Sequence, residues 1–153
     1  MAVVLASTSS AQVTLLVSVD SGGAQGNSVS GDPSISTDGR YVAFDSLASN
    51  LVLGDTNGLE DVFVRDRLTG TTERVSISTG GTEGNGFSAI PSISADGRYV
   101  AFESVASNLV PGDTNGTRDV FVRDRQTGTT QRVSIDSSGV QMVGTSTFSS
   151  TSR

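Results

Sequence analysis

Residues 33–77 read PSISTDGRYVAFDSLASNLVLGDTNGLEDVFVRDRLTGTTERVSI, and residues 91–135 read PSISADGRYVAFESVASNLVPGDTNGTRDVFVRDRQTGTTQRVSI. The second stretch begins 58 positions after the first, and 37 of its 45 residues are identical to the first. A repeat of this length with several short strand signals inside each unit is typical of repeat arrays and β-propellers. The repeat therefore decides the architecture, whereas it says much less about a ligand, because near-identical units mostly carry packing and turns.

Each unit contains four strand signals. In the first unit these lie at residues 33–36, 40–46, 61–67 and 71–77. Asp38-Gly39 and Thr69-Gly70 separate the first two and the last two signals, and such pairs favour hairpins because Gly accepts the positive φ of tight turns. The run 41–44 is apolar on both sides of the pleat, so this strand is expected to be sandwiched. We therefore predict an all-β fold of two complete four-stranded antiparallel β-propeller blades with partial flanking blades.

The phase of the repeat divides the chain into segments. The predicted segments are a non-repeat N-terminal segment (1–12), the outer strand and loop of a preceding blade (13–32), blade 1 (33–77), an inter-blade loop (78–90), blade 2 (91–135) and the start of a following blade (136–153). Two blades alone leave two apolar faces uncovered, and large apolar patches rarely persist on soluble monomers. We therefore expect the chain to pair with itself in a ring-closing homo-oligomer, most simply a trimer with six blades. A fragment of a longer propeller and a short open array are the alternatives.

Consecutive antiparallel strands place their connections at alternate ends of a blade. The tight turns are therefore expected on one rim, and the long loops on the other. The long loops are predicted at residues 47–60 and 105–118, after the second strand of each unit, and at 20–32 and 78–90, between units. Any function is expected on the rim that carries these loops.

Composition excludes several classes of function. The net charge is −6 and all ten basic residues are Arg, scattered through the repeats, so nucleic acid is not expected as a partner. The apolar run near the N-terminus is too short for a membrane span, and no membrane insertion is expected. Richness in Asp, Gly, Ser and Thr suits an exported protein, which favours an extracellular or periplasmic location.

Catalysis is restricted by the residues that the chain lacks. Without His, Cys and Lys there is no Ser-His-Asp triad, no Cys-His pair and no Schiff-base lysine. Carboxylate chemistry remains, and Asp45 and Glu103, near the ends of the second strands, are the candidate catalytic residues. Because they occupy duplicated positions, a unique acid and base are hard to separate from a structural pattern, and we favour a protein that is not an enzyme.

The repeated GDTNG loop is the candidate metal site. Asp, Asn and Asp recur there with the spacing Asp-x-Asn-Gly-x-x-Asp, as Asp55, Asn57, Asp61, Asp113, Asn115 and Asp119. Calcium takes about six to eight oxygen ligands, and closely spaced Asp and Asn on a loop bent by Gly can supply several of them. The pattern lacks the fifth-position acid and the closing Glu of an EF-hand loop. The alternative is structural: the first two residues form Asx turns and the last caps the third strand.

PSISADGRYVAF followed by DVFVRD resembles the WD40-like PD40 repeat of TolB-type β-propellers. The resemblance covers residues 18–138, and its core is Ser-x-Asp-Gly-Arg followed by a strand that ends in an aromatic residue. This chain departs from that family in the long loop between the second and third strands, which is usually short there. The resemblance implies propeller blades and often a binding role, and it carries over no catalytic residue.

Together these observations predict a non-catalytic β-propeller binding or scaffold module. It would present repeated polar loops on one rim to a glycan, peptide or protein, with calcium as a candidate stabilising ion. The alternatives are a carboxylate-dependent hydrolase acting on glycans or esters, and a propeller fragment without a function of its own.

Overall fold

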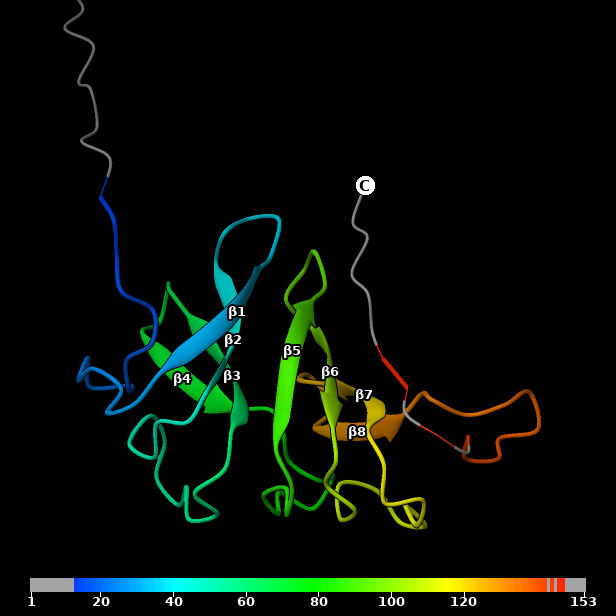
Figure 1. Ribbon diagram of the computed structural model, residues 1–153. Coiled ribbons are helices and arrows are strands. Elements are labelled where there is room, and N and C mark those ends of the chain that lie inside the picture. The colour runs from blue at the N-terminus through cyan, green and yellow to red at the C-terminus, as the bar shows by residue number, and fades with distance from the viewer. Residues whose placement is uncertain (1–12, 143, 145, 148–153) are drawn as a thin grey trace, which may run out of the picture.

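The computed structural model describes residues 13–142, 144, 146 and 147. These residues form two four-stranded antiparallel sheets, each with its strands in chain order (Figure 1). The first sheet consists of β1 (Ser30–Ile35), β2 (Tyr41–Ser46), β3 (Asp61–Asp66) and β4 (Thr71–Arg74). The second consists of β5 (Ser88–Ile93), β6 (Tyr99–Ser104), β7 (Asp119–Asp124) and β8 (Thr129–Arg132). The predicted all-β fold with two complete blades is confirmed.

The connections lie at alternate ends of the sheets. Figure 1 shows the turns from β1 to β2 and from β5 to β6 at the top, and the loops from β2 to β3 and from β6 to β7 at the bottom. Gly39 and Gly97 adopt φ values of 70° and 73° in the two tight turns, a conformation that favours glycine. We call the two ends of each blade the short-turn rim and the long-loop rim.

The innermost strands begin earlier than the sequence indicates. β1 begins at Ser30 and β5 at Ser88, each three residues before the predicted start at a proline, so the loops predicted at 20–32 and 78–90 are shorter. The register of each inner strand shifts around this proline, between Gly31 and Ser34 and between Ala89 and Ser92. Asp32 and Ile90 have positive φ at this bulge. A bulge lets a proline, which has no N–H to donate, lie inside a strand.

The predicted flanking blades are present only in part. Residues 13–18 form no strand, and Val19 makes a single bridge to Gln25. No neighbouring strand of a preceding blade lies within the described residues, so an outer strand at 13–19 has nothing to pair with there. The predicted segment 1–12 and residues 143, 145 and 148–153 of the predicted following blade lie outside the described residues.

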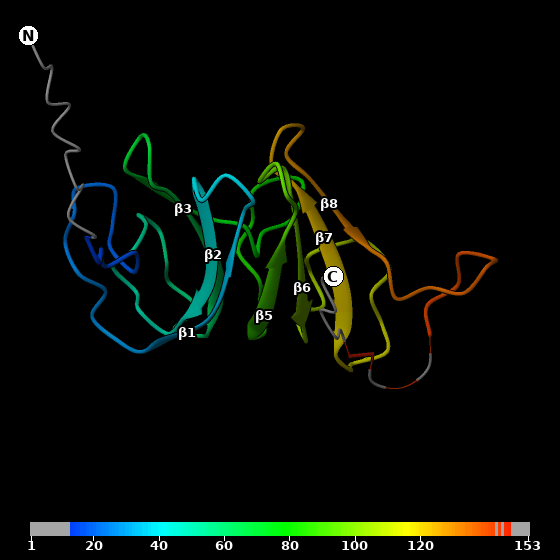
Figure 2. The same ribbon diagram turned by 90° about the horizontal axis from the view of Figure 1, so that it is seen from above.

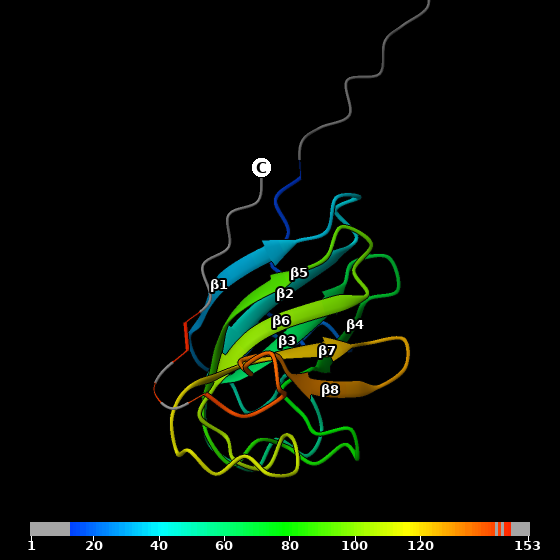
Figure 3. The same cartoon turned by 90° about the vertical axis from the view of Figure 1, so that its right-hand side faces the viewer.

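The two sheets pack face to face, and β5 lies against the first three strands (Figures 2 and 3). Each blade has a front face with two stacked phenylalanines, Phe44 and Phe63 in blade 1 and Phe102 and Phe121 in blade 2. The back face of blade 1 carries smaller apolar residues that join the front face of blade 2 in one core. The members of this core are Ala43, Val62, Val64, Val75, Ile93, Val100, Phe102, Ala106, Leu109 and Phe121. Blades therefore stack front to back.

The front face of blade 1 contains the equivalent half-core. Phe44, Ala48, Leu51 and Phe63 are buried there as a separate cluster. A Cβ at Gly26 would lie 3.2 Å from the Ala48 Cβ and 3.3 Å from Leu51 Cδ2, so residues before β1 close over this cluster.

The described part of the chain contains no helix that is long and apolar enough to cross a membrane.

Candidate functional site

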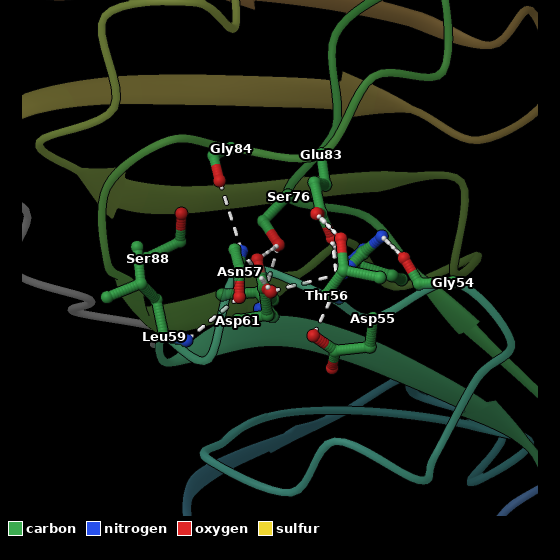
Figure 4. A network of polar contacts seen from close by, with 12 residues as sticks. Gly54, Asp55, Thr56, Asn57, Leu59, Asp61, Ser76, Glu83, Gly84 and Ser88 are labelled. Carbon is green, nitrogen blue, oxygen red and sulfur yellow. Dashed lines mark hydrogen bonds and ion pairs between the residues drawn. The ribbon is translucent and has the colours of Figure 1, made fainter.

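The GDTNG loop of blade 1 converges on a polar network with residues from two other segments (Figure 4). We call Asp55, Asn57, Asp61, Arg74 and Glu83 network 1. Asp55 and Asn57 lie in the long loop, Asp61 begins β3, Arg74 ends β4, and Glu83 lies in the following loop. The structure thus brings the three predicted residues together, as the sequence indicates.

Asn57 closes the loop as an Asx turn. Its Oδ1 accepts a hydrogen bond from the Leu59 backbone N–H at 2.8 Å. Its Nδ2 donates to Asp61 Oδ2 at 2.9 Å and to the Gly84 carbonyl at 3.0 Å. The amide therefore joins the loop, the third strand and the next inter-blade loop, which is the geometry expected of a structural turn.

Arg74 lies among three carboxylates. Its Nη1 is 3.3 Å from Asp55 Oδ1, 3.3 Å from Asp61 Oδ2 and 2.8 Å from Glu83 Oε2. Burial raises the pKa of Asp55 and of Asp61. The hydrogen bonds from Thr56 lower the pKa of Glu83. The guanidinium supplies positive charge where the carboxylates are least hydrated, and it stabilises the ionised loop.

The contacts of network 1 bear on the predicted calcium site. Both Asp61 oxygens are already used, since Oδ1 accepts from Ser76 Oγ at 2.5 Å and Oδ2 faces Asn57 and Arg74. Asn57 turns its nitrogen toward the carboxylates, whereas a metal needs its oxygen. Among the described residues no group of three or more acidic side chains is placed to hold a metal ion. A calcium ion would have to displace Arg74, and calcium binding stays a prediction.

Blade 2 contains the equivalent network 2, which is Asp113, Asn115, Asp119, Arg132 and Gln141. Asn115 repeats the contacts of Asn57, with Oδ1 accepting from the Thr117 N–H at 2.9 Å. Gln141 replaces Glu83, and its Nε2 donates to Asp113 Oδ1 at 2.9 Å. Burial raises the pKa of Asp113. Network 2 therefore has one guanidinium as the counter-charge for two carboxylates, and an amide donates a hydrogen bond to one of them.

The candidate catalytic carboxyls lie on the back faces of their blades, each in its own surroundings. Asp45 is buried, and its Oδ2 accepts from the Ile90 N–H of blade 2 at 3.1 Å. Burial raises the pKa of Asp45, and the neighbouring Asp32 raises it further. Glu103 is also buried, and its Oε2 pairs with Arg118 Nη1 at 2.9 Å. Both residues take part in structural contacts, and a hydrolase built on them stays a prediction.

Each blade also carries a pocket on its outer side. The pocket of blade 1 has a volume of about 340 Å³, and that of blade 2 about 470 Å³. Both lie between the turn before the blade, the start of the long loop and the outermost strand. Eight lining residues correspond at an offset of 58: Asp20, Ser21, Gly22, Asn50, Leu51, Val52, Leu53 and Thr72 in blade 1, and Ser78, Thr79, Gly80, Asn108, Leu109, Val110, Pro111 and Thr130 in blade 2. Ser107 and Gly112 also line the pocket of blade 2.

Paired asparagines hold the loop that forms one wall of each pocket. In blade 1 the Asn27 N–H donates to Asn50 Oδ1 at 2.8 Å, while Asn27 Oδ1 accepts from the Ser49 N–H at 3.0 Å. In blade 2 Asn85 and Asn108 make the same contacts at 2.9 Å each, with Ser107 as the second donor. These reciprocal bonds tie each long loop to the segment before its blade.

Sequence reasoning did not find the arginines, Glu83 or the paired asparagines. Their signal was present, since Arg74 and the asparagines recur 58 residues later as Arg132, Asn85 and Asn108. Repetition alone does not reveal which of the shared residues meet, because each partner comes from another strand or loop of the blade.

No family model and no curated protein matches the chain. It is similar to solved structures. The putative TolB from Agrobacterium tumefaciens is 18% identical, with 69% of this chain and 30% of that chain covered and a TM-score of 0.46. The β-propeller domain of the Trilobed protease from Pyrococcus furiosus, described with an open velcro topology, is 15% identical, with 69% and 27% covered and a TM-score of 0.47. TolB from Acinetobacter baumannii is 20% identical, with 67% and 32% covered and a TM-score of 0.27.

The predicted TolB-like propeller repeat is confirmed at the level of fold. The chain spans less than a third of the length of each of these three solved chains. The activity of a whole protein of that length therefore lies outside the comparison.

Proposed function

We propose that this β-propeller chain is a non-catalytic, exported binding or scaffold module that takes a peptide, protein segment or glycan in its outer pockets. One observation supports the proposal above all: the same pocket, with the same floor, recurs in both blades. Residues at the ends of strands and in the loops of a rigid scaffold are the usual carriers of binding.

The composition of the pockets fits an extended, partly apolar ligand. Leu51 and Leu109 form buried floors, and Leu53 and Pro111 are exposed at the edges. Hydroxyl and amide groups from Ser, Thr and Asn surround this apolar strip. Apolar contact with a few polar groups is the usual composition of a ligand pocket. Two equivalent pockets would also let a repetitive ligand bind at two points, which raises its apparent affinity.

The test is an NMR titration of the full chain with two probes, a mixture of short random peptides and a mixture of soluble oligosaccharides. We expect one probe to shift the amide signals of Asn50, Leu53, Asn108 and Val110 together. Leu53→Glu and Pro111→Glu place a charge at the edge of each pocket without opening the core. The double variant should weaken binding about tenfold, equivalent to about 1.4 kcal/mol.

The matched control is Leu68→Glu, because Leu68 is an exposed leucine at the short-turn rim. This variant should bind as the unaltered chain does. Signals that shift only at the short-turn rim, or binding that the double variant leaves unchanged, would contradict the outer pockets as the binding site.

A further inference from the structure

The two blades contact each other closely around Tyr41, at the short-turn rim. Gly97 lies so close to Tyr41 that a Cβ there would be 2.1 Å from Tyr41 Cδ2. Arg125 Cζ lies 4.4 Å from the centroid of the Tyr41 ring, and Arg125 Nε is 2.6 Å from Glu73 Oε1. Arg125 also donates to the Gly97 carbonyl. The turn and the arginine of one blade thus pack on the tyrosine of the other.

Backbone contacts extend this junction toward the long-loop rim. The Ile93 N–H donates to Ser34 Oγ at 3.1 Å, and the Thr37 N–H donates to the Ala95 carbonyl at 3.0 Å. Near the other end of β5, the Ser88 N–H donates to the Glu60 carbonyl at 2.7 Å. Blade 1 therefore contacts β5 near both of its ends.

Both halves of this junction recur on faces that no blade covers among the described residues. On the front face of blade 1, Ile35 is 57% exposed, whereas its equivalent in the junction, Ile93, is 9% exposed. On the back face of blade 2, Tyr99 is 41% exposed. The turn is already in its docking conformation, because Arg67 Nη1 donates to the Gly39 carbonyl at 2.6 Å as Arg125 does to Gly97.

The back face of blade 2 also has an unfilled cavity, which we call the socket. A cavity of about 200 Å³ is lined by Tyr99, Val122, Asp124, Thr129 and Gln131. These residues are the equivalents of Tyr41, Val64, Asp66, Thr71 and Glu73, the surface on which the turn at Gly97 and Arg125 docks. The socket therefore carries the equivalents of the residues on which Gly97 and Arg125 dock, and Gly39 and Arg67 of another copy are the residues that would fill it.

One difference at the junction bears on charge. Glu73 of blade 1 pairs with Arg125 of blade 2 at 2.6 Å, and the equivalent of Glu73 on the back face of blade 2 is Gln131. Asp124 also lines the cavity there, so a carboxylate lies where Arg67 of a docking copy would approach.

We propose that a second copy of this chain docks head to tail, with the front face of its blade 1 on the back face of blade 2 of the first copy. Such a contact joins two different surfaces, so it continues until a ring closes or a ladder grows. Three copies would make six blades, within the range of closed propellers. The inference rests on the blade junction alone and is independent of the outer pockets.

The chain itself already contacts this docking surface near the long-loop rim. Thr117 Oγ1 donates to the Gly144 carbonyl at 3.1 Å. The Ser146 N–H donates to the Arg118 carbonyl at 2.9 Å, the contact that Ser88 makes with Glu60. The socket around Tyr99 and Gln131 lies at the opposite rim. A docking copy must therefore displace residue 146 while it fills the socket, and a chain that ends at residue 142 should associate more tightly than the full chain.

The decisive experiment uses two blocked variants in sedimentation velocity over a wide range of concentration. The full chain should form trimers or larger species. Ile35→Arg blocks the front face and Tyr99→Arg blocks the back face, so each variant alone should stay monomeric. Their equimolar mixture should form dimers and nothing larger, because one competent face remains on each partner. A mixture that stays monomeric, or a symmetric dimer in either single variant, would overturn head-to-tail docking.

A gain of affinity provides a second test that does not depend on disrupting a surface. Gln131→Glu restores the acid that pairs with the arginine in the existing junction, and it should tighten association about two- to fivefold, as an exposed ion pair does. Gln126→Glu adds the same charge outside the socket and serves as the control. Equal effects of the two variants would contradict the proposal. So would a full chain that stays monomeric while the chain ending at residue 142 associates, since the occupant would then be its own C-terminal segment.

Discussion

Networks 1 and 2 share four residues and differ in the fifth. In network 1 three carboxylates surround Arg74, and Glu83 makes the shortest ion pair of the three at 2.8 Å. In network 2 two carboxylates surround Arg132, which lies 3.2 Å from Asp113 and 3.9 Å from Asp119, while Gln141 donates to Asp113. The same loop is thus stabilised by a charge in one blade and by an amide in the other.

The loop backbone is almost unchanged by this exchange. Gly58 and Gly116 have φ values of 66° and 64°, and Asn57 and Asn115 donate to Asp61 and Asp119 at the same 2.9 Å. The shape of the loop therefore depends on the residues within it, whereas its charge balance depends on a residue contributed by the next loop. Comparing the two blades therefore separates the residues that set the shape of the loop from the residue that sets its charge balance.

The largest expected difference follows from removing the arginine. Arg74→Met should leave three carboxylates without a counter-charge and lower the free energy of unfolding by about 3 kcal/mol, the usual effect of breaking a buried pair. Arg132→Met should cost about 1 kcal/mol less, because Gln141 still bonds an Asp oxygen. Urea denaturation at neutral pH measures both losses.

The matched control for these variants is Gln126→Met, since Gln126 is exposed and lies outside both networks. It should leave the unfolding midpoint nearly unchanged. Equal losses for Arg74→Met and Arg132→Met would show that the fifth residue does not distinguish the networks.

A smaller effect, equal in both blades, is expected at the other rim. Arg40 bonds Asp66 through Nε at 3.0 Å and Nη2 at 2.7 Å, and Arg98 bonds Asp124 at 3.0 and 2.6 Å. These arginines hold the pKa of both carboxyls well below the usual range. Because the folded pKa is lowered, the stabilisation is present above the unfolded value of about 3.9 and is lost as the pH falls toward the folded value.

Asp66→Asn and Asp124→Asn should therefore lower the unfolding midpoint equally at pH 7, and both losses should shrink as the solution is acidified below about pH 3.9. Thermal unfolding by circular dichroism at several pH values measures this. A loss that differs strongly between the blades, or that grows on acidification, would contradict the assignment of these pairs as identical structural clamps.

The smallest expected effect concerns calcium. Any binding should be stronger in network 1, which has one more carboxylate, and should lie in the range of about 10⁻⁴ to 10⁻³ M typical of extracellular modules. Glu83→Gln should remove the difference, and Gln141→Glu should confer it on network 2. The amide signals of Gly58 and Gly116 report on each loop separately. Signals that calcium does not move in any of these chains would exclude calcium as a stabilising ion here.

Much of the fold was predictable because it depends on local signals. Glycine in the Asp-Gly turns and apolar residues on both faces of residues 41–44 predicted the hairpins and the sandwiched strands. The early start of β1 was not predictable, since Pro33 reads as a strand boundary and only the bulge at Asp32 lets the strand pass through it. The meeting of Asp55, Asn57 and Asp61 was predicted from their spacing, whereas Arg74 and Glu83 were not.

The sequence by itself determined the repeat, the four strands of each blade, the turns between them and the chemistry that absent residues exclude. These features depend on neighbouring residues and on a period that can be read along the chain. Only the tertiary structure decided that an arginine stands among the carboxylates, that Asp45 meets Ile90 of the next blade, and that two outer pockets form. The physical reason is that the burial of a side chain and its bonding partners depend on which segments lie next to each other. Segments far apart in the chain become neighbours only when the sheets pack.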